Sequence, residues 1–242
     1  MGVAYGSSTI YQATKGIVQD GLVLNLDAGV KQSYDSVGDN WYDLSETGAY
    51  GTLLNTPSFD RGKGGSILLD GTNTRVVFST PSVASIGSSN HTISAWIKNT
   101  TKSDEDFVST GAGTGKILLM IYSQAGGGQG GFRGHSWSST GASNTIDSPN
   151  PIGTGNWNYL TQHVDWDDGN IKLFENGSLV KTQALSGSKP SVSLNILSLG
   201  NRTGATNNDF DGNIAVVHIH NRALTATEVA QNFNVTRHRF GI

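Results

Sequence analysis

Apolar and polar residues alternate in short segments along most of the chain. In 21–29 (GLVLNLDAG), Leu22, Leu24 and Leu26 fall on one side of the alternation and Asn25 falls on the other. Successive side chains of a β-strand point to opposite faces of the sheet, so a period of two predicts a strand with one buried face. Strand-length segments of the same kind follow in SILLDG and TRVVFS, with turn residues between them.

One segment has apolar residues on both faces. In 91–99 (HTISAWIKN), Ile93, Ala95 and Ile97 share one side and Trp96 lies on the other. A strand that is apolar on both faces is covered on both faces. We therefore expect 91–99 to be a central strand with a layer packed against each side.

The stretch 156–185 predicts three strands in a meander. Asp168-Gly169 and Asn176-Gly177 favour the left-handed geometry of two-residue hairpin turns, and NIKLFE between them has the length of a strand. On the preceding strand, the inward series is Leu160, Val164 and Trp166.

A short helix is predicted near the C-terminus, at LTATEVAQNF. Thr225 and Glu228 have the spacing of a capping box, and Leu224 and Val229 that of a hydrophobic staple. Many short strands followed by one helix predict an all-β sandwich or barrel.

Composition excludes several classes of function. Charged residues make up 14% of the 242 residues, the net charge is −3 and there is no cysteine. Without a dense basic face we expect no nucleic-acid binding, and the apolar runs are too short to span a bilayer. The first residues contain no basic segment followed by an apolar one, so we expect no secretory signal. The lack of cysteine excludes disulfides, thiolate catalysis and Cys-ligated zinc.

Three long segments resemble one family. WNYLTQHVDWDDGNIKLFENGSLV (157–180) resembles the core of laminin-G-like domains, and FDGNIAVVHIHNRALTATEV (210–229) resembles their closing strand and helix. IVQDGLVLNLDAG (17–29) completes the pattern, so the resemblance covers roughly residues 17–233. It implies a concanavalin A-like jelly roll of two antiparallel sheets packed face to face, with one short C-terminal helix.

Within that superfamily, the opening GLVLNLDAG with WYDLS and the ending NFNVTRHRFGI are most similar to structural proteins of tailed bacteriophages. This similarity implies a non-enzymatic virion protein, assembled in the host cytoplasm, that decorates the capsid or forms a fibre or appendage. Its partners would be other virion proteins and copies of itself. We divide the chain into an N-terminal arm (1–16), a jelly-roll domain (17–235) and a C-terminal tail (236–242). We expect the arm and the tail to contact neighbouring molecules.

The alternative function is that of a lectin-like module that attaches to cell-surface glycans. In the strand GFRGHSW, which follows a Gly-rich loop, Arg133, His135 and Trp137 alternate onto one side. Trp137 would stack on a sugar, with Arg133 and His135 as hydrogen-bond donors. We expect no phosphate site in that loop, because it lacks the lysine and the following helix.

Two histidines one residue apart, His218 and His220, raise the question of a metal site. A zinc ion would need a third ligand, and His163 and His135 are the candidates, although nothing in the sequence places them alongside. We interpret both histidines as surface residues on the outer face of a strand and assign no metal.

The acidic clusters SDEDF (103–107) and DWDDG (165–169) are candidates for catalysis. A glycosidase needs two carboxyl groups about 5–10 Å apart. Neither cluster has the Glu-x-Asp-x-x-Glu spacing that would place such a pair on one strand, so we predict no enzyme. We interpret Asp104, Glu105 and Asp106 as a solvated loop.

Calcium is the cofactor that many laminin-G-like relatives bind, through loop aspartates. No aspartates here form a recognisable ligand series, and Asp70 and Asp211 precede glycine as turn formers do. We therefore assign no cofactor. The candidates considered are Asp165, Asp167, Asp168, Asp209 and Asp211.

Overall fold

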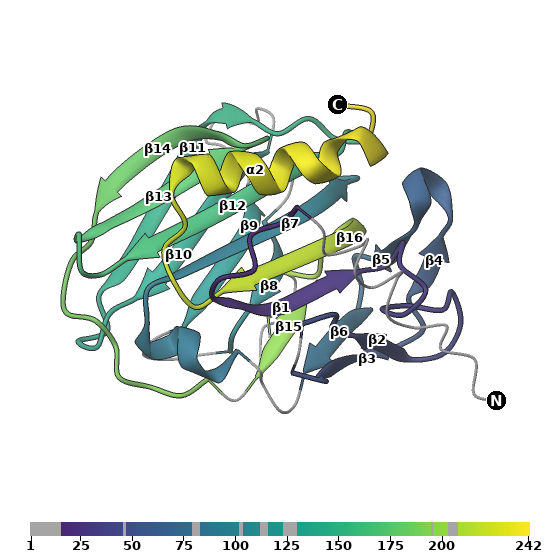
Figure 1. The fold of residues 1–242 in the computed structure, drawn as a ribbon, viewed down its shortest axis with the longest axis horizontal. Coiled ribbons are helices and arrows are strands. Elements are labelled where there is room, and N and C mark those ends of the chain that lie inside the picture. Colours follow the sequence, from purple (N-terminus) through teal and green to yellow (C-terminus); the bar gives the residue numbers. More distant parts are fainter. Residues whose placement is uncertain are drawn as a thin grey trace.

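The protein is a sandwich of two antiparallel sheets, as the sequence predicted (Figure 1). The computed structural model describes residues 16–45, 47–78, 83–101, 104–111, 116–122, 130–194, 196–202 and 208–242. Within these residues each sheet has eight strands, and the main hydrophobic core lies between the sheets.

The first sheet, sheet A, has the order β14-β13-β12-β7-β16-β5-β4, with β1 also paired to β16. Its strands are β1 (Leu22–Asp27), β4 (Ser58–Asp60), β5 (Ser66–Asp70), β7 (His91–Asn99), β12 (Asn158–Asp165), β13 (Asn170–Glu175), β14 (Ser178–Ala184) and β16 (Asp211–His220).

The second sheet, sheet B, has the order β11-β10-β9-β8-β15-β6-β3-β2. Its strands are β2 (Asn40–Tyr42), β3 (Tyr50–Leu54), β6 (Arg75–Phe78), β8 (Glu105–Ser109), β9 (Ile117–Tyr122), β10 (Gly131–Trp137), β11 (Ser143–Pro151) and β15 (Leu197–Leu199). Three short 3-10 helices, η1 (Gly62–Gly64), η2 (Ala84–Ser88) and η3 (Arg237–Arg239), and the α-helix α2 (Ala226–Thr236) complete the described elements.

β7 is the central strand that its sequence predicts. It pairs with β12 on one side and β16 on the other. Ile93, Ala95 and Ile97 face the core between the sheets. Trp96 points to the opposite face of sheet A and belongs to a second apolar cluster that includes Tyr159 and Phe233. The second cluster explains why this strand is apolar on both faces.

The two predicted hairpins of the meander are present. Gly169, Asn176 and Gly177 adopt positive φ, at 65°, 48° and 77°. β12 pairs with β13, and β13 with β14, across these turns. Asn176 and Gly177 form the predicted two-residue turn, because both tolerate this left-handed geometry. Four residues, 166–169, join β12 to β13, and Asp168 is not left-handed, so the prediction of a two-residue turn at Asp168-Gly169 is wrong.

Helix α2 lies on the outside of sheet A (Figure 1). The predicted capping box is formed, since the Glu228 amide donates to Thr225 Oγ1 and the Thr225 amide donates to the Glu228 carboxylate. Leu224 and Val229 pack together with Phe174 of β13. No helix in the described ranges combines the length and apolar character that crossing a membrane requires.

The C-terminal tail folds back onto its own domain, contrary to the prediction that it reaches a neighbour. Phe240 is 4% exposed and stacks on Trp96. Arg239 donates to the Asp27 carboxylate and to the carbonyl oxygen of Lys63. The tail covers the apolar outer side of sheet A, so its apolar side chain Phe240 is buried against the same chain. Of the predicted N-terminal arm, residues 1–15 lie outside the described residues.

Candidate functional site

β10 presents Arg133, His135 and Trp137 on the outer face of sheet B. Phe132, between them, is fully buried in the core. Gly134 also faces inward, where a Cβ atom would lie 2.4 Å from Gln162 Oε1. The strand therefore alternates between an inward set and an outward, partly exposed set, as GFRGHSW predicts.

The outer face around Arg133 continues across the neighbouring strands β8, β9 and β11. Arg133 is opposite Met120 of β9 and Asp147 of β11, and Met120 is opposite Asp106 of β8. Residues directly opposite one another in a sheet share a face. Asp106, Met120, Arg133 and Asp147 therefore form one row across four strands, on the same side of the sheet as Trp137.

Arg133 is already engaged by protein groups. Its Nε and Nη2 atoms donate to the two carboxylate oxygens of Asp147, at 2.5 and 2.8 Å. The hydrogen bonds that Arg133 donates to Asp147 raise the pKa of Arg133, and the guanidinium lies 4.2 Å from the ring centroid of Tyr122. The sequence analysis assigned Arg133 as a hydrogen-bond donor to a sugar. In the structure, the Nε and Nη2 donors of Arg133 are instead used in this bidentate ion pair with Asp147.

Trp137 and His135 form an aromatic stack. Their ring centroids are 5.1 Å apart and the planes differ by 19°. His135 Nδ1 lies 2.9 Å from Thr145 Oγ1, and the Lys116 ammonium is 4.6 Å from the Trp137 ring centroid. Burial, followed by the charge of Arg133, lowers the pKa of His135 to about 4, so the imidazole is neutral at pH 7.

Asp106 and Glu105 are buried in β8, so the interpretation of Asp104, Glu105 and Asp106 as a solvated loop is wrong for these two residues. The contacts of Asp106 extend the outer face. The Asp106 Oδ2 atom lies 3.0 Å from Arg202 Nε. Burial raises the pKa of Asp106 to about 6, and the charges of Arg202 and Lys116 oppose the rise. The neighbouring Phe107 is a fully buried core residue, which draws the segment into β8, where a bulge follows Asp106.

Sequence reasoning missed Lys116, Arg202 and Asp106 as members of this face. Lys116 precedes β9 and Arg202 follows β15, so they come together only through the pairing of β8 with both strands. The one local signal was the apolar pair Phe107-Val108, which is typical of a strand and not of a solvated loop.

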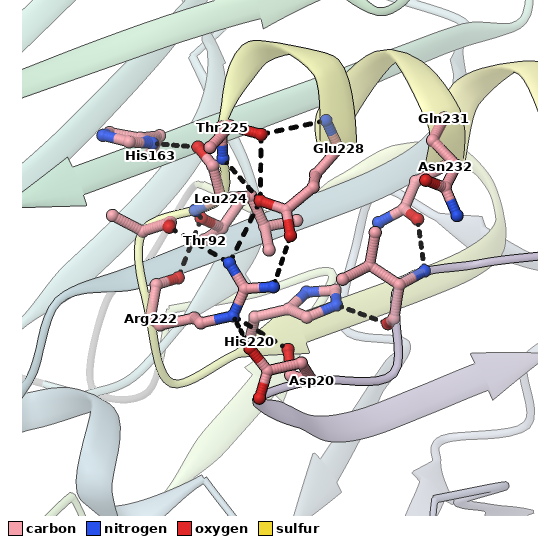
Figure 2. Close-up of polar contacts among 12 residues, drawn as sticks. Asp20, Thr92, His163, His220, Arg222, Leu224, Thr225, Glu228, Gln231 and Asn232 are labelled. Atoms are coloured by element: carbon pink, nitrogen blue, oxygen red, sulfur yellow. Dashed lines mark hydrogen bonds and ion pairs between the residues drawn. The ribbon is translucent and has the colours of Figure 1, made fainter.

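The two histidines of β16 are buried, not exposed as the sequence analysis predicted. His220 Nε2 lies 2.9 Å from the Val18 carbonyl oxygen, beneath the segment that leads into β1 (Figure 2). Burial lowers the pKa of His218 to about 3. Helix α2 and this segment cover the outer face of sheet A, which explains the burial. Val18 is held in turn by Asn232 of α2, whose Oδ1 accepts from the Val18 amide at 2.8 Å.

A metal site is not formed by these histidines. His163 lies in the same row as His220, with Thr92 between them, and its Nδ1 is 2.9 Å from the Leu224 carbonyl oxygen (Figure 2). His135 lies in the other sheet. Among the described residues, no three His, Cys, Asp or Glu side chains come close enough together to hold a metal ion.

Of the aspartates considered for calcium, Asp165 holds a turn, whereas Asp209 accepts from Asn201. Asp211 begins strand β16, so its interpretation as a turn former is wrong. Asp165 Oδ1 accepts from the amides of Asp167 and Asp168 in the hairpin turn, and Asn90 bridges Asp165 and Asp167. Asp70 accepts from the amides of residues 72–74. These contacts agree with the assignment of Asp70 as a turn former.

Structural comparison finds the same fold in binding domains of bacterial proteins. The binding domain of botulinum neurotoxin serotype G aligns with a TM-score of 0.69 and 16% identity, over 88% of this chain and 51% of that one. The chain thus spans about half the length of this toxin domain. The binding domain of botulinum neurotoxin DC in complex with SialylT aligns with a TM-score of 0.68 and 14% identity, over 90% and 52% of the two chains.

A third similar structure is domain 4 of AbnA, a GH43 extracellular arabinanase from Geobacillus stearothermophilus, in complex with arabinotriose. It aligns with a TM-score of 0.61 and 20% identity, over 87% of this chain and 97% of that one. At these identities the three likenesses show the fold.

The family follows from the sequence. Comparison with curated proteins finds no significant match. Residues 70–230 match the family model Laminin_G_3, described as the concanavalin A-like lectin/glucanases superfamily. The chain belongs to this superfamily.

Proposed function

We propose that the protein is a carbohydrate-binding module and that the outer face of sheet B, around Trp137, holds the glycan. The observation that carries the proposal is the half-buried stack of Trp137 on His135, beside the partly exposed cations Lys116 and Arg202. An indole packs against the apolar face of a sugar ring, while cationic side chains donate hydrogen bonds to its oxygens.

The comparisons support this function over the alternatives. The neighbours are toxin binding domains and a domain of an arabinanase, and two of them are complexes with SialylT or arabinotriose. The site differs in one respect from the one inferred from the sequence. Lys116 and Arg202 act as donors, because Arg133 is occupied by Asp147.

The module binds glycans without cleaving them. Across this face, Asp106 and Asp147 are separated by the two strands β9 and β10. Neighbouring strands lie about 4.8 Å apart, so the two carboxylates are on the order of 14 Å apart. That is wider than the separation of about 5–10 Å that glycosidases use.

A glycan array tests the proposed function. We expect the chain to bind a defined subset of immobilised glycans and to release no reducing ends from soluble forms of the same glycans. An array with no binding above background would exclude the proposed function, and release of reducing ends would show an enzyme instead.

The second candidate is a structural protein of a phage particle, and a glycan-binding module is compatible with that role. It rests on the resemblance of 21–29, 41–45 and 232–242 to phage structural proteins, which was drawn from the sequence alone. Density-gradient banding of particles, probed with antibody to this chain, tests it. Co-banding with intact particles would support the virion, and recovery only in the soluble fraction would exclude it.

A further inference from the structure

The three cationic side chains around Trp137 differ in what balances their charge. Arg133 forms a bidentate ion pair with Asp147, and Arg202 pairs with the buried Asp106. Lys116 lies over the Trp137 ring, and within the described part of the chain no carboxylate forms an ion pair with it. Among the described residues, Lys116 therefore lacks an ion-pair partner, although the charge of Asp106 acts on it.

The cations and the carboxylate also differ in exposure. The Asp106 side chain is 0% exposed, whereas the Arg202 side chain is 28% exposed and Lys116 is half-buried. A ligand on this face would therefore meet Lys116 and Arg202, with Asp106 beneath them. Burial lowers the pKa of Lys116, and the charge of Arg202 lowers it further against a smaller opposite effect of Asp106. Of the two charges that act on Lys116, that of Arg202 therefore outweighs that of Asp106.

We propose, resting on the proposed function, that this face selects sugars that carry a carboxylate. The sugar carboxylate pairs with Lys116 and Arg202 while the sugar ring packs on Trp137. Asp106 lies beneath Arg202 and partly neutralises its charge. A neutral sugar would leave the charge of Lys116 without a partner, whereas a carboxylate neutralises it in a partly desolvated site.

The position of Asp106 beneath Arg202 should make the affinity for the sugar depend on pH. The pKa of Asp106 is about 6, so Asp106 loses its negative charge between pH 7 and pH 5. The other groups whose charges act on it are Arg202, Lys116 and Asp104, and the first two stay cationic throughout. His135, with a pKa of about 4, stays neutral in this range. The loss of this negative charge makes the face more positive, so affinity for a carboxylated sugar rises as the pH falls.

Matched sugar pairs test the selectivity. Calorimetry with the full chain at pH 7 measures the affinity for each member of two pairs. One pair is a glucuronate-terminated and a glucose-terminated oligosaccharide, and the other is sialyllactose and lactose. We expect the carboxylated member of at least one pair to bind at least about tenfold more tightly. Lys116→Gln and Arg202→Gln should each reduce this preference several-fold. Lys181→Gln, which removes an exposed cation from β14 of sheet A, should leave it intact.

The pH profile provides a second readout. Affinity for the carboxylated sugar should rise from pH 7 to pH 5 in the wild type. Asp106→Asn should bind at pH 7 about as tightly as the wild type does at pH 5, with no further change. A wild-type affinity that falls or stays constant over this range would contradict the proposal.

The outcomes separate this inference from the proposed function. Equal binding of both members of every pair, or a preference that survives Lys116→Gln and Arg202→Gln, overturns the carboxylate selectivity and leaves glycan binding standing. Tighter binding of a sulfated lactose than of sialyllactose overturns the choice of carboxylate as the anion. If no sugar of any kind binds, the proposed function itself fails.

Discussion

The indole ring of Trp96 stacks on the phenyl ring of Phe240, with centroids 4.0 Å apart and planes that differ by 21°. Trp96 lies in the central strand β7, and Phe240 lies two residues before the last residue of the chain, Ile242. The contact joins the tail to the outer face of sheet A and, with Phe233 of α2, covers the apolar side of β7. The tail is therefore part of the folded domain.

Removing this contact should destabilise the domain. Phe240→Ala deletes a 4% exposed ring, and such truncations of buried phenylalanine cost about 3–5 kcal/mol. Urea unfolding followed by circular dichroism measures the change. Ile242→Ala, at a side chain 46% exposed, serves as the control and should change stability by less than about 0.5 kcal/mol. A loss below about 1 kcal/mol for Phe240→Ala would show that the tail contributes little to the fold.

The capping box of α2 gives a second stability test. Thr225→Ala removes the oxygen that accepts from the Glu228 amide and should cost about 1 kcal/mol. Thr227→Ala, two residues on at an exposed helical position, removes no cap and should be neutral or slightly stabilising. Chemical denaturation of both variants distinguishes the cap from a general effect of threonine, and equal changes in the two would contradict the capping role.

Buried neutral histidines should make the protein sensitive to mild acid. The folded pKa values of His91 and His218, about 4 and about 3, lie below the value of 6.5 expected for the unfolded chain. Below pH 6.5 the unfolded state therefore binds protons that the folded state excludes. Stability is complete above pH 6.5 and falls as the pH is lowered towards the folded pKa values, by up to about 1.4 kcal/mol per pH unit for each histidine.

Unfolding free energies at intervals between pH 7.5 and pH 5 measure this effect. His218→Asn should have a shallower pH dependence than the wild type, because one of the buried groups no longer titrates. His238→Asn removes an exposed histidine and should reproduce the wild-type slope. A wild-type stability that is constant over this range would mean that the buried histidines are protonated at no cost.

Local signals in the sequence predicted the features that depend on few residues. Asp168-Gly169 and Asn176-Gly177 indicated two hairpins because left-handed backbone favours those residue types. The spacing of Thr225 and Glu228 indicated the start of α2. The alternation in 131–137 placed Arg133, His135 and Trp137 on one face. Each of these rules concerns residues close together in the chain.

The features that sequence reasoning missed depend on distant partners. His218 and His220 do lie opposite the core side of β16, but α2 and the segment around Val18 cover them. No local pattern reveals such a cover. Asp106 and Arg202 meet only because β8 pairs with β15, and that order of strands is a property of the whole sheet. For the same reason the bidentate ion pair between Arg133 and Asp147 could not be predicted from β10 alone.

The most direct test of glycan binding at the outer face of sheet B is calorimetric titration of Trp137→Ala with the tightest-binding sugar from the array. The matched control is Tyr50→Ala, which removes an exposed aromatic ring from β3 of the same sheet. The ring centroid of Tyr50 lies 5.7 Å from that of Tyr42. We predict that Trp137→Ala weakens binding at least about tenfold and that Tyr50→Ala leaves it unchanged. Unchanged affinity in Trp137→Ala, with a folded protein by circular dichroism, would contradict the assignment of this face as the glycan site.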